Sequence, residues 1–231
     1  MRRFWKEVSV GEDGGGFRVA LDGRPLRTQG GAPQIVPSRT LADALAEEWR
    51  AQGEVVDPHG FPMRDMADLA IDWIAADRPA QIATLLRYAE TDTLCYRADP
   101  EEPLFRRQQE VWEPLVEAAE ARHGVRFERV SGIVHRPQPA ETLATLRALL
   151  ERQSDFALAA LATLAPLGAS LIVALAALEA EANTAALFAA ANCEEDWQVE
   201  LWGSDAEAAE VRAAREGAFM LAARFARLAR A

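Results

Sequence analysis

Short runs in which apolar and polar residues partly alternate fill the start of the chain and predict a small antiparallel sheet. Asp22 and Gly23 lie between two of these runs, and an Asp-Gly pair is a preferred centre of a tight hairpin turn. The runs on either side of this pair are therefore expected to form a hairpin. Connections that contain glycine or proline separate the runs, which cover residues 3–10, 16–22, 24–28 and 34–38.

One helix is expected to follow the sheet. Ser38 is a suitable N-cap, and Leu45 and Trp49 recur at the spacing of one helical face. The next segment, EVVDPHGFP at residues 54–62, contains two prolines and a glycine, which is typical of a linker. We place a domain boundary there, so that the predicted domains are a small β-rich domain ending in one helix, 1–60, and a helical domain, 61–231.

Helical periodicity dominates the rest of the chain. The exception is segment 125–134, which is expected to be a short strand or an extended crossover. The predicted fold class is α+β, with a small antiparallel β-rich N-terminal domain followed by a larger, mainly α-helical domain resembling an orthogonal bundle. Helices are expected over residues 63–76, 79–97, 103–124, 139–153, 183–203 and 205–229, together with an alanine-rich pair within 156–178.

The segment 156–178 contains no charged residue and is long enough to cross a membrane. Pro166 interrupts it, and acidic residues flank it instead of a one-sided excess of Lys and Arg. Two buried helices, bent or broken at Pro166, are the alternative that these features favour. We therefore expect no stable insertion into a membrane.

Charge and cysteine content narrow the class of partner. The 231 residues carry a formal net charge of −11 at pH 7 and include two cysteines. So acidic a chain repels nucleic-acid phosphates, and a nucleic-acid partner is not expected. Two cysteines far apart in the sequence make no disulfide framework and indicate a reducing compartment. No export signal precedes the first strand, so the expected location is the cytoplasm.

Residues with catalytic potential are present but form no diagnostic pattern. The glycine-rich segment 11–16 begins like a phosphate-binding loop, but Phe17 and Arg18 stand where Lys and Ser or Thr are needed. The three histidines lack the spacing of a zinc site, so neither a metal nor another cofactor is expected. Cys95 has no histidine nearby in the sequence and is expected to pack. The alternative is a small-molecule enzyme that uses Asp92 with Cys95 or a carboxylate set such as Asp65, Asp68 and Asp72.

Tryptophans stand beside carboxylates at three places: EEW at 47–49, EVWEPL at 110–115 and CEEDWQVELWG at 193–203. Exposed tryptophans commonly anchor protein interfaces, and nearby charges set the register of binding. The same side chains could instead belong to the core. Recognition of another protein, by a chaperone or by a generic adaptor, is the function class that these strings favour.

Six strings in this order across almost the whole chain resemble the Atp-twelve family of assembly chaperones for the α subunit of the ATP synthase catalytic head. They are FWKEVSV, LDGRPLRT, LAEEWRAQGEVVDP, ETDTLCYRA, RQQEVWEPL and EEDWQVELWG. Six ordered matches are far more specific than any one of them. The resemblance implies a chaperone that is not an enzyme, with a β-rich N-terminal domain and a helical C-terminal domain, in agreement with the periodicity.

The resemblance also implies a client and a set of important residues. The protein would bind the free α subunit, shield the apolar surface that later meets the β subunit, and promote assembly, because such a surface aggregates unless it is covered. Trp49 matches a tryptophan needed for function, and Glu195 or its neighbour Glu194 matches an acidic residue implicated in chaperone activity. We expect both carboxylates to face the partner. The positions marked as partner-binding or functionally critical are Trp49, Asp92, Glu194, Glu195, Trp202 and Gly203.

The start of the chain differs from eukaryotic members of that family. Only three residues precede FWKEV, so no mitochondrial targeting segment is expected. The natural inference is a bacterial member that works in the cytoplasm on the bacterial α subunit.

Overall fold

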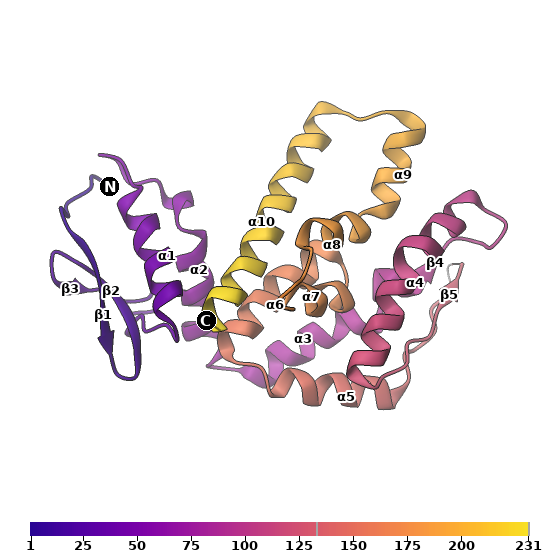
Figure 1. Ribbon diagram of the computed structural model, residues 1–231, viewed down its shortest axis with the longest axis horizontal. Helices are drawn as coiled ribbons and strands as arrows, with labels where there is room; N and C mark the ends of the chain where they lie inside the picture. Colours follow the sequence, from indigo (N-terminus) through magenta and orange to yellow (C-terminus); the bar gives the residue numbers. More distant parts are fainter. Residues whose placement is uncertain (133, 231) are drawn as a thin grey trace. The chain divides into compact units, whose positions relative to one another are not determined.

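The computed structural model describes residues 1–132 and 134–230, and short strands precede a long series of helices (Figure 1). This architecture confirms the predicted α+β class. The strands are β1 (Val8–Asp13), β2 (Gly16–Leu21), β3 (Arg24–Pro25), β4 (Tyr96–Arg97) and β5 (Val130–Ser131). The α-helices are α1 (Arg39–Arg50), α2 (Pro62–Asp68), α3 (Arg78–Glu90), α4 (Pro103–His123), α5 (Ala140–Glu151), α6 (Asp155–Gly168), α7 (Leu171–Ala177), α8 (Thr184–Ala191), α9 (Cys193–Trp202) and α10 (Ala206–Arg230).

The first three strands form one antiparallel sheet in the order β1-β2-β3. Gly14 and Gly15 make the turn between β1 and β2 with positive φ angles, so the glycine-rich segment is a hairpin connection. Asp22 and Gly23, with φ angles of 48° and 76°, turn the chain from β2 into β3. Two positive φ angles in succession are the geometry of a type I′ turn, which confirms the predicted Asp-Gly hairpin.

The chain divides into two compact units. Unit 1 contains Met1–Arg78, Ser154–Ala160 and the described residues from Leu221 onward, and unit 2 contains Pro79–Gln153 and Leu161–Met220. In unit 1, α1 lies against β1 and β2. The predicted division into domains 1–60 and 61–231 remains a prediction.

Ser38 is the N-cap of α1, as predicted. Its hydroxyl oxygen accepts the backbone N–H of Leu41 (3.1 Å) and its O–H donates to the carbonyl of Leu228 in α10. An N-cap of this kind satisfies one of the donors left free at the start of a helix. The same side chain thus ties the first helix of unit 1 to residues near the other end of the chain.

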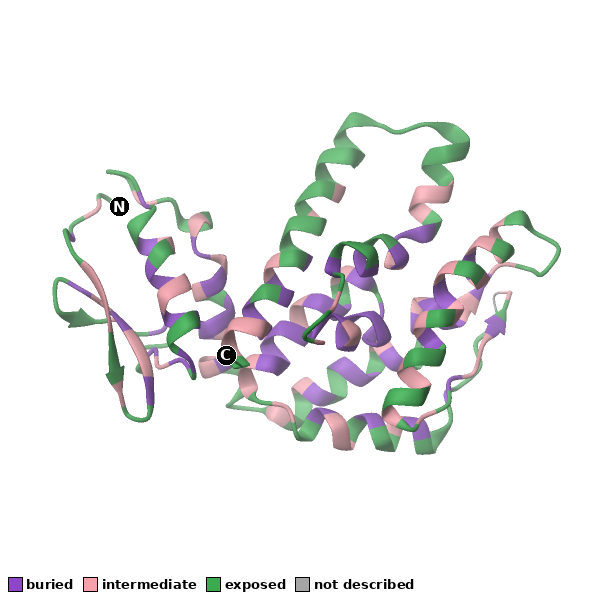
Figure 2. Cartoon of the chain, viewed as in Figure 1, coloured by how far each residue is buried: buried purple, intermediate pink, exposed green. Residues whose placement is uncertain are grey.

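The apolar segment 156–178 forms two helices, α6 and α7, which are largely buried (Figure 2). Pro166 lies in the last turn of α6, and the break comes three residues later at Ala169, whose φ is 44°. Ser170 then caps α7 by accepting the N–H of Val173 (3.0 Å). Among the described residues, no helix combines the length and the apolar character that crossing a bilayer requires.

Three predicted elements require correction. The helix expected over 79–97 ends at Glu90; a 3-10 turn at Thr93–Cys95 and strand β4 follow, and β4 pairs in parallel with β5. The segment 63–76 continues from α2 into a π-helix at Leu69–Ile74. The helix expected over 183–203 is divided at Asn192, whose side-chain amide donates to the carbonyl of Phe188 (2.8 Å) and ends α8. Polar side chains that bond to the backbone lie at the first and the last of these breaks. Asn192 bonds locally, whereas Asp92 accepts both a local N–H and that of the distant Ile172.

Candidate functional site

In unit 2, α9 and the first part of α10 form a helical hairpin that stands largely in solvent (Figure 2). We call residues 193–220 the arm. Every residue from Gln198 to Val211 is exposed. Gly203 ends α9 with φ 85° and ψ 169°, a conformation that is essentially restricted to glycine. The sharp end of α9 therefore depends on Gly203, one of the residues predicted to be functionally critical.

The arm displays large apolar side chains. Trp202 is 77% exposed, far more than is usual for tryptophan. Single exposed apolar residues are common, but several on one hairpin make a surface suited to another apolar surface. The exposed apolar residues between the start of α9 and the first turns of α10 are Val199, Leu201, Trp202 and Val211.

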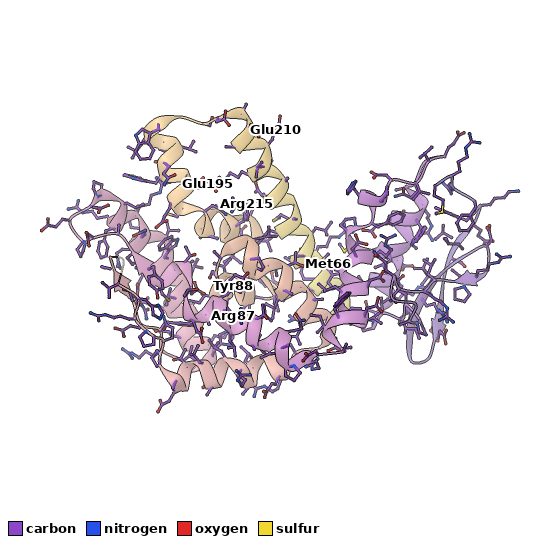
Figure 3. The ribbon with its side chains drawn as sticks, turned by 180° about the vertical axis from the view of Figure 1, so that it is seen from behind. Met66, Arg87, Tyr88, Glu195, Glu210 and Arg215 are labelled. Carbon is purple, nitrogen blue, oxygen red and sulfur yellow. The ribbon has the colours of Figure 1, made fainter. Side chains whose placement is uncertain are left out.

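Ion pairs hold the two helices of the arm together. Arg215 donates to the Glu195 carboxylate (3.0 Å) and to the side-chain oxygen of Asn192 (2.7 Å). Arg212 lies 2.7 Å from the carboxylate of Asp196. Figure 3 shows Glu195 and Arg215 facing one another between α9 and α10, with Glu210 nearer the start of α10. Glu195 thus acts as a cross-link within the arm.

A second set of contacts fixes the arm to α4. The side-chain amide of Gln108, which is fully buried, donates to the Glu194 carboxylate (2.7 Å). Arg107 donates to Glu200 (2.5 Å), and its guanidinium lies 5.7 Å from the centre of the Trp197 ring. The hydrogen bond from Arg107 lowers the pKa of the Glu200 carboxyl below its usual value. Polar contacts therefore position α9 on two sides.

These contacts bear on the expectation that Glu194 and Glu195 face the partner. Each carboxylate has a partner inside unit 2, so a change of charge at either position would disturb the arm as well as any contact with a client. Their role in binding remains a proposal. The sequence analysis did not identify the two arginines that face Glu195. Arg212 and Arg215 are three residues apart on one helix, a spacing that puts them on the same side.

Trp49 lies in the aromatic core of unit 1. Only 9% of it is exposed, and its ring centre is 5.0 Å from that of Trp5 and 4.5 Å from that of Phe61. Its neighbour Glu48 accepts the backbone N–H groups of Met63 (2.6 Å) and of the following residue (3.0 Å), at the start of α2. Burial raises the pKa of the Glu48 carboxyl. Trp49 is therefore a core residue of unit 1.

Asp92 and Cys95 lie in the interior of unit 2. One oxygen of Asp92 accepts the N–H of Leu94 (3.1 Å) and the other accepts the N–H of Ile172 (3.0 Å), so the carboxylate joins the 3-10 turn to the start of α7. Burial raises the pKa of Asp92 to about 6. Cys95 is fully buried, and burial raises the pKa of its thiol, which disfavours the reactive thiolate. The prediction that Cys95 packs is confirmed.

The acidic set in unit 1 has a structural task. Asp65, Asp68 and Asp72 line a shallow pocket of about 650 Å³. Asp72 accepts the hydroxyl of Thr28 (2.7 Å) and the backbone N–H of Gly30 (2.9 Å), so the carboxylate holds the turn that follows β3. Within residues 1–132 and 134–230, no group of three or more His, Cys, Asp and Glu side chains is arranged to hold a metal ion.

Known proteins with the same architecture place this chain among the chaperones. A family model described as ATP12 chaperone protein matches residues 2–120. Protein atp12, mitochondrial, of Schizosaccharomyces pombe is 30% identical over 222 residues, which cover 91% of this chain and 76% of that protein. The protein is therefore a member of the chaperone class.

Solved structures agree with that class. Two structures of Atp12 from Paracoccus denitrificans, one of them of a mutant, have a TM-score of 0.93 and 38% identity, covering 99% of this chain and 97% to 98% of the other. The Atu1473 protein of Agrobacterium tumefaciens has a TM-score of 0.91 and 43% identity, covering 97% of this chain and 84% of that one. This chain belongs to the ATP12 chaperone family, which is the family that its sequence resembles.

Proposed function

We propose that this protein is a bacterial, cytoplasmic assembly chaperone of ATP synthase that binds the unassembled α subunit of the catalytic head. It shields the apolar surface of that subunit that later meets the β subunit, and it promotes assembly without catalysing a reaction. Membership in the ATP12 chaperone family carries this proposal. The exposed apolar residues of the arm support it, because a holding chaperone needs an apolar surface of its own.

The site residues divide into two groups under this proposal. Trp202 binds the client directly, Gly203 sets the end of α9, and Glu194 and Glu195 hold the arm in place. The buried residues Trp49 and Asp92 act through the fold. Binding must be weaker than that of the β subunit, so that the true partner displaces the chaperone when the two compete. Release by displacement requires no nucleotide hydrolysis.

The enzyme alternative gains no support from its named residues. Both oxygens of Asp92 accept backbone N–H groups, and Cys95 is buried. Two carboxylates of the acidic set, those of Asp68 and Asp72, accept backbone N–H groups of the turn that follows β3. A generic adaptor, by contrast, would use the same arm, so the distinction between adaptor and chaperone is a matter of what happens to the client.

Light scattering from the freshly diluted bacterial α subunit, with and without an equal concentration of this protein and without nucleotide, tests the proposal. We expect suppressed scattering together with a one-to-one complex on gel filtration. A complex that aggregates as fast as the free subunit would identify an adaptor. Unchanged scattering with no complex would contradict both forms of the proposal.

A further inference from the structure

A groove of about 740 Å³ lies in unit 2 between α4, α8 and the connection from α7 to α8. Most of its lining is apolar, and on the α8 side the side chains are small. Alanines leave open space where larger residues would fill the contact between the two helices. The apolar wall includes Val111, Pro114 and Leu115 of α4 and Ala186, Leu187 and Ala190 of α8.

Charged residues surround this groove. Three carboxylates line it, at Glu110, Glu179 and Glu181, against one guanidinium, that of Arg122. Arg122 forms an ion pair with Glu179. Glu110 and Glu181 are exposed, and in the described part of the chain neither takes part in an ion pair. The rim therefore carries excess negative charge that a basic group could neutralise.

Proline inside α4 adds a backbone acceptor. Pro114 has no N–H, so the carbonyl of Glu110 lacks the donor that a regular helix would supply four residues later. Both residues line the groove. The groove thus combines apolar walls, an acidic rim and a backbone carbonyl without its usual helical donor.

We infer that this groove binds a short apolar segment of the client that carries a lysine or arginine beside its apolar side chains. The apolar part would release water from the alanine-rich walls, and the basic group would meet the rim near Glu110 and Glu181. An acidic flank would be repelled, which gives the groove a preference among apolar segments.

The groove lies next to the base of the arm. Ala190 lines the groove, its carbonyl accepts the indole N–H of Trp112 (2.7 Å), and α9 begins at Cys193. A client held at the arm therefore has the groove close by within the same unit, so that the second contact forms at a raised effective concentration. The inference rests on the proposed function and adds a second contact of defined chemistry.

Filling the groove tests the inference. In Ala186→Phe a large ring would occupy the space on the α8 wall, and Ala185→Phe, an exposed alanine of the same helix outside the lining, is the matched control. We expect the Kd for the purified α subunit to rise about tenfold or more in the first variant and to stay within about twofold of wild type in the second. Both variants should melt like the wild type.

Charge variants test the rim without changing the packing of the groove. We expect Glu110→Lys to weaken binding of the α subunit by about tenfold at low salt and by less at high salt. Glu117→Lys, on the same helix but outside the lining, should have a smaller effect.

Overlapping peptides of the α subunit identify the segment that occupies the groove. The peptide that competes should hold a basic residue beside apolar ones, and competition by acidic or purely polar peptides alone would contradict the assigned chemistry.

The outcomes separate the two claims. If the wild-type protein does not bind the α subunit, the proposed function fails and the groove loses its client. If the wild type binds while Ala186→Phe and Glu110→Lys bind equally well, the groove inference is overturned and the proposed function stands. If Ala186→Phe does not fold, the charge variant and the peptide competition decide.

Discussion

Two tryptophan motifs of similar sequence have opposite environments in this protein. In EEW at 47–49 the tryptophan is 9% exposed, whereas the EEDWQVELW string ends at Trp202, which is 77% exposed. Helix α1 carries Leu41, Leu45 and Trp49 on one buried face, while most of α9 is polar or exposed. The pattern of the whole helix, and not the acidic residues beside a tryptophan, therefore decides which tryptophan belongs to the core.

The carboxylates of the two motifs differ in the same way. Glu48 accepts two backbone N–H groups at the start of α2, which is a task inside the fold. Glu195 pairs with Arg215 across the arm, where both side chains are partly exposed. The same kind of motif, carboxylates beside a tryptophan, thus stabilises the fold of unit 1 and holds the exposed arm of unit 2 in place.

The largest expected effect on stability is that of Trp49→Ala. Removing the ring leaves a cavity beside Trp5 and Phe61 and should cost about 3–5 kcal/mol of unfolding free energy. Chemical denaturation measures the loss, and client protection should fall in step with it. Trp49→Phe, which keeps an aromatic ring, should lose less. If Trp49→Ala melted like the wild type and yet failed to protect the α subunit, Trp49 would be a contact residue.

The sequence predicted those parts of the fold whose signals are local. Ser38 caps α1 through an N–H three residues away, and Asp22 with Gly23 forms a hairpin from two adjacent residues. The turn at Thr93–Cys95 was missed because Asp92 also bonds to Ile172, far away in the sequence. Periodicity carries no information about such a contact.

The candidate site was predicted less completely than the fold. Trp202 and Gly203 were marked through resemblance, but only the structure shows that the tryptophan is exposed and that the glycine has a conformation disfavoured for other residues. The partners of Glu194 and Glu195 come from α4 and α10, so no local pattern around the carboxylates could reveal them. The groove depends on small residues of α8 facing α4, which is likewise a tertiary property.

Asp92 should give the second largest effect, through pH. Its pKa is raised to about 6 from an ordinary value of 3.8, so the folded state binds this proton more tightly than the unfolded state. The contribution of Asp92 to unfolding free energy is therefore greatest below about pH 4 and falls by about 3 kcal/mol as the pH rises through 6. Chemical denaturation of the wild type and of Asp92→Asn, from pH 4 to 7, gives the difference in unfolding free energy between the two proteins at each pH. If Asp92 had an ordinary pKa, this difference would not change with pH over that range.

A smaller effect on stability is expected from the cross-link in the arm. A double-mutant cycle with Glu195→Gln and Arg215→Gln should give a coupling energy of about 0.2–1 kcal/mol, because both side chains are partly exposed. The effect on client binding should be larger. Glu195→Arg should weaken it, and adding Arg215→Glu should restore part of it if Glu195 positions the arm. No recovery in the exchanged pair would instead indicate direct contact between Glu195 and the client.

The smallest effect on stability is expected for Trp202→Ala, at the other end of the comparison with Trp49. Because this ring is mostly in solvent, its removal should change unfolding free energy by no more than about 0.5 kcal/mol. Binding of the α subunit should nevertheless weaken by about 2 kcal/mol, or roughly thirtyfold, if Trp202 anchors the interface. Calorimetric titration measures the loss, and Trp73→Ala, which removes a 69% exposed tryptophan of unit 1, is the matched control. Equal losses in both variants would show that exposed tryptophans bind the client without specificity, and no loss in either would remove the arm from the interface.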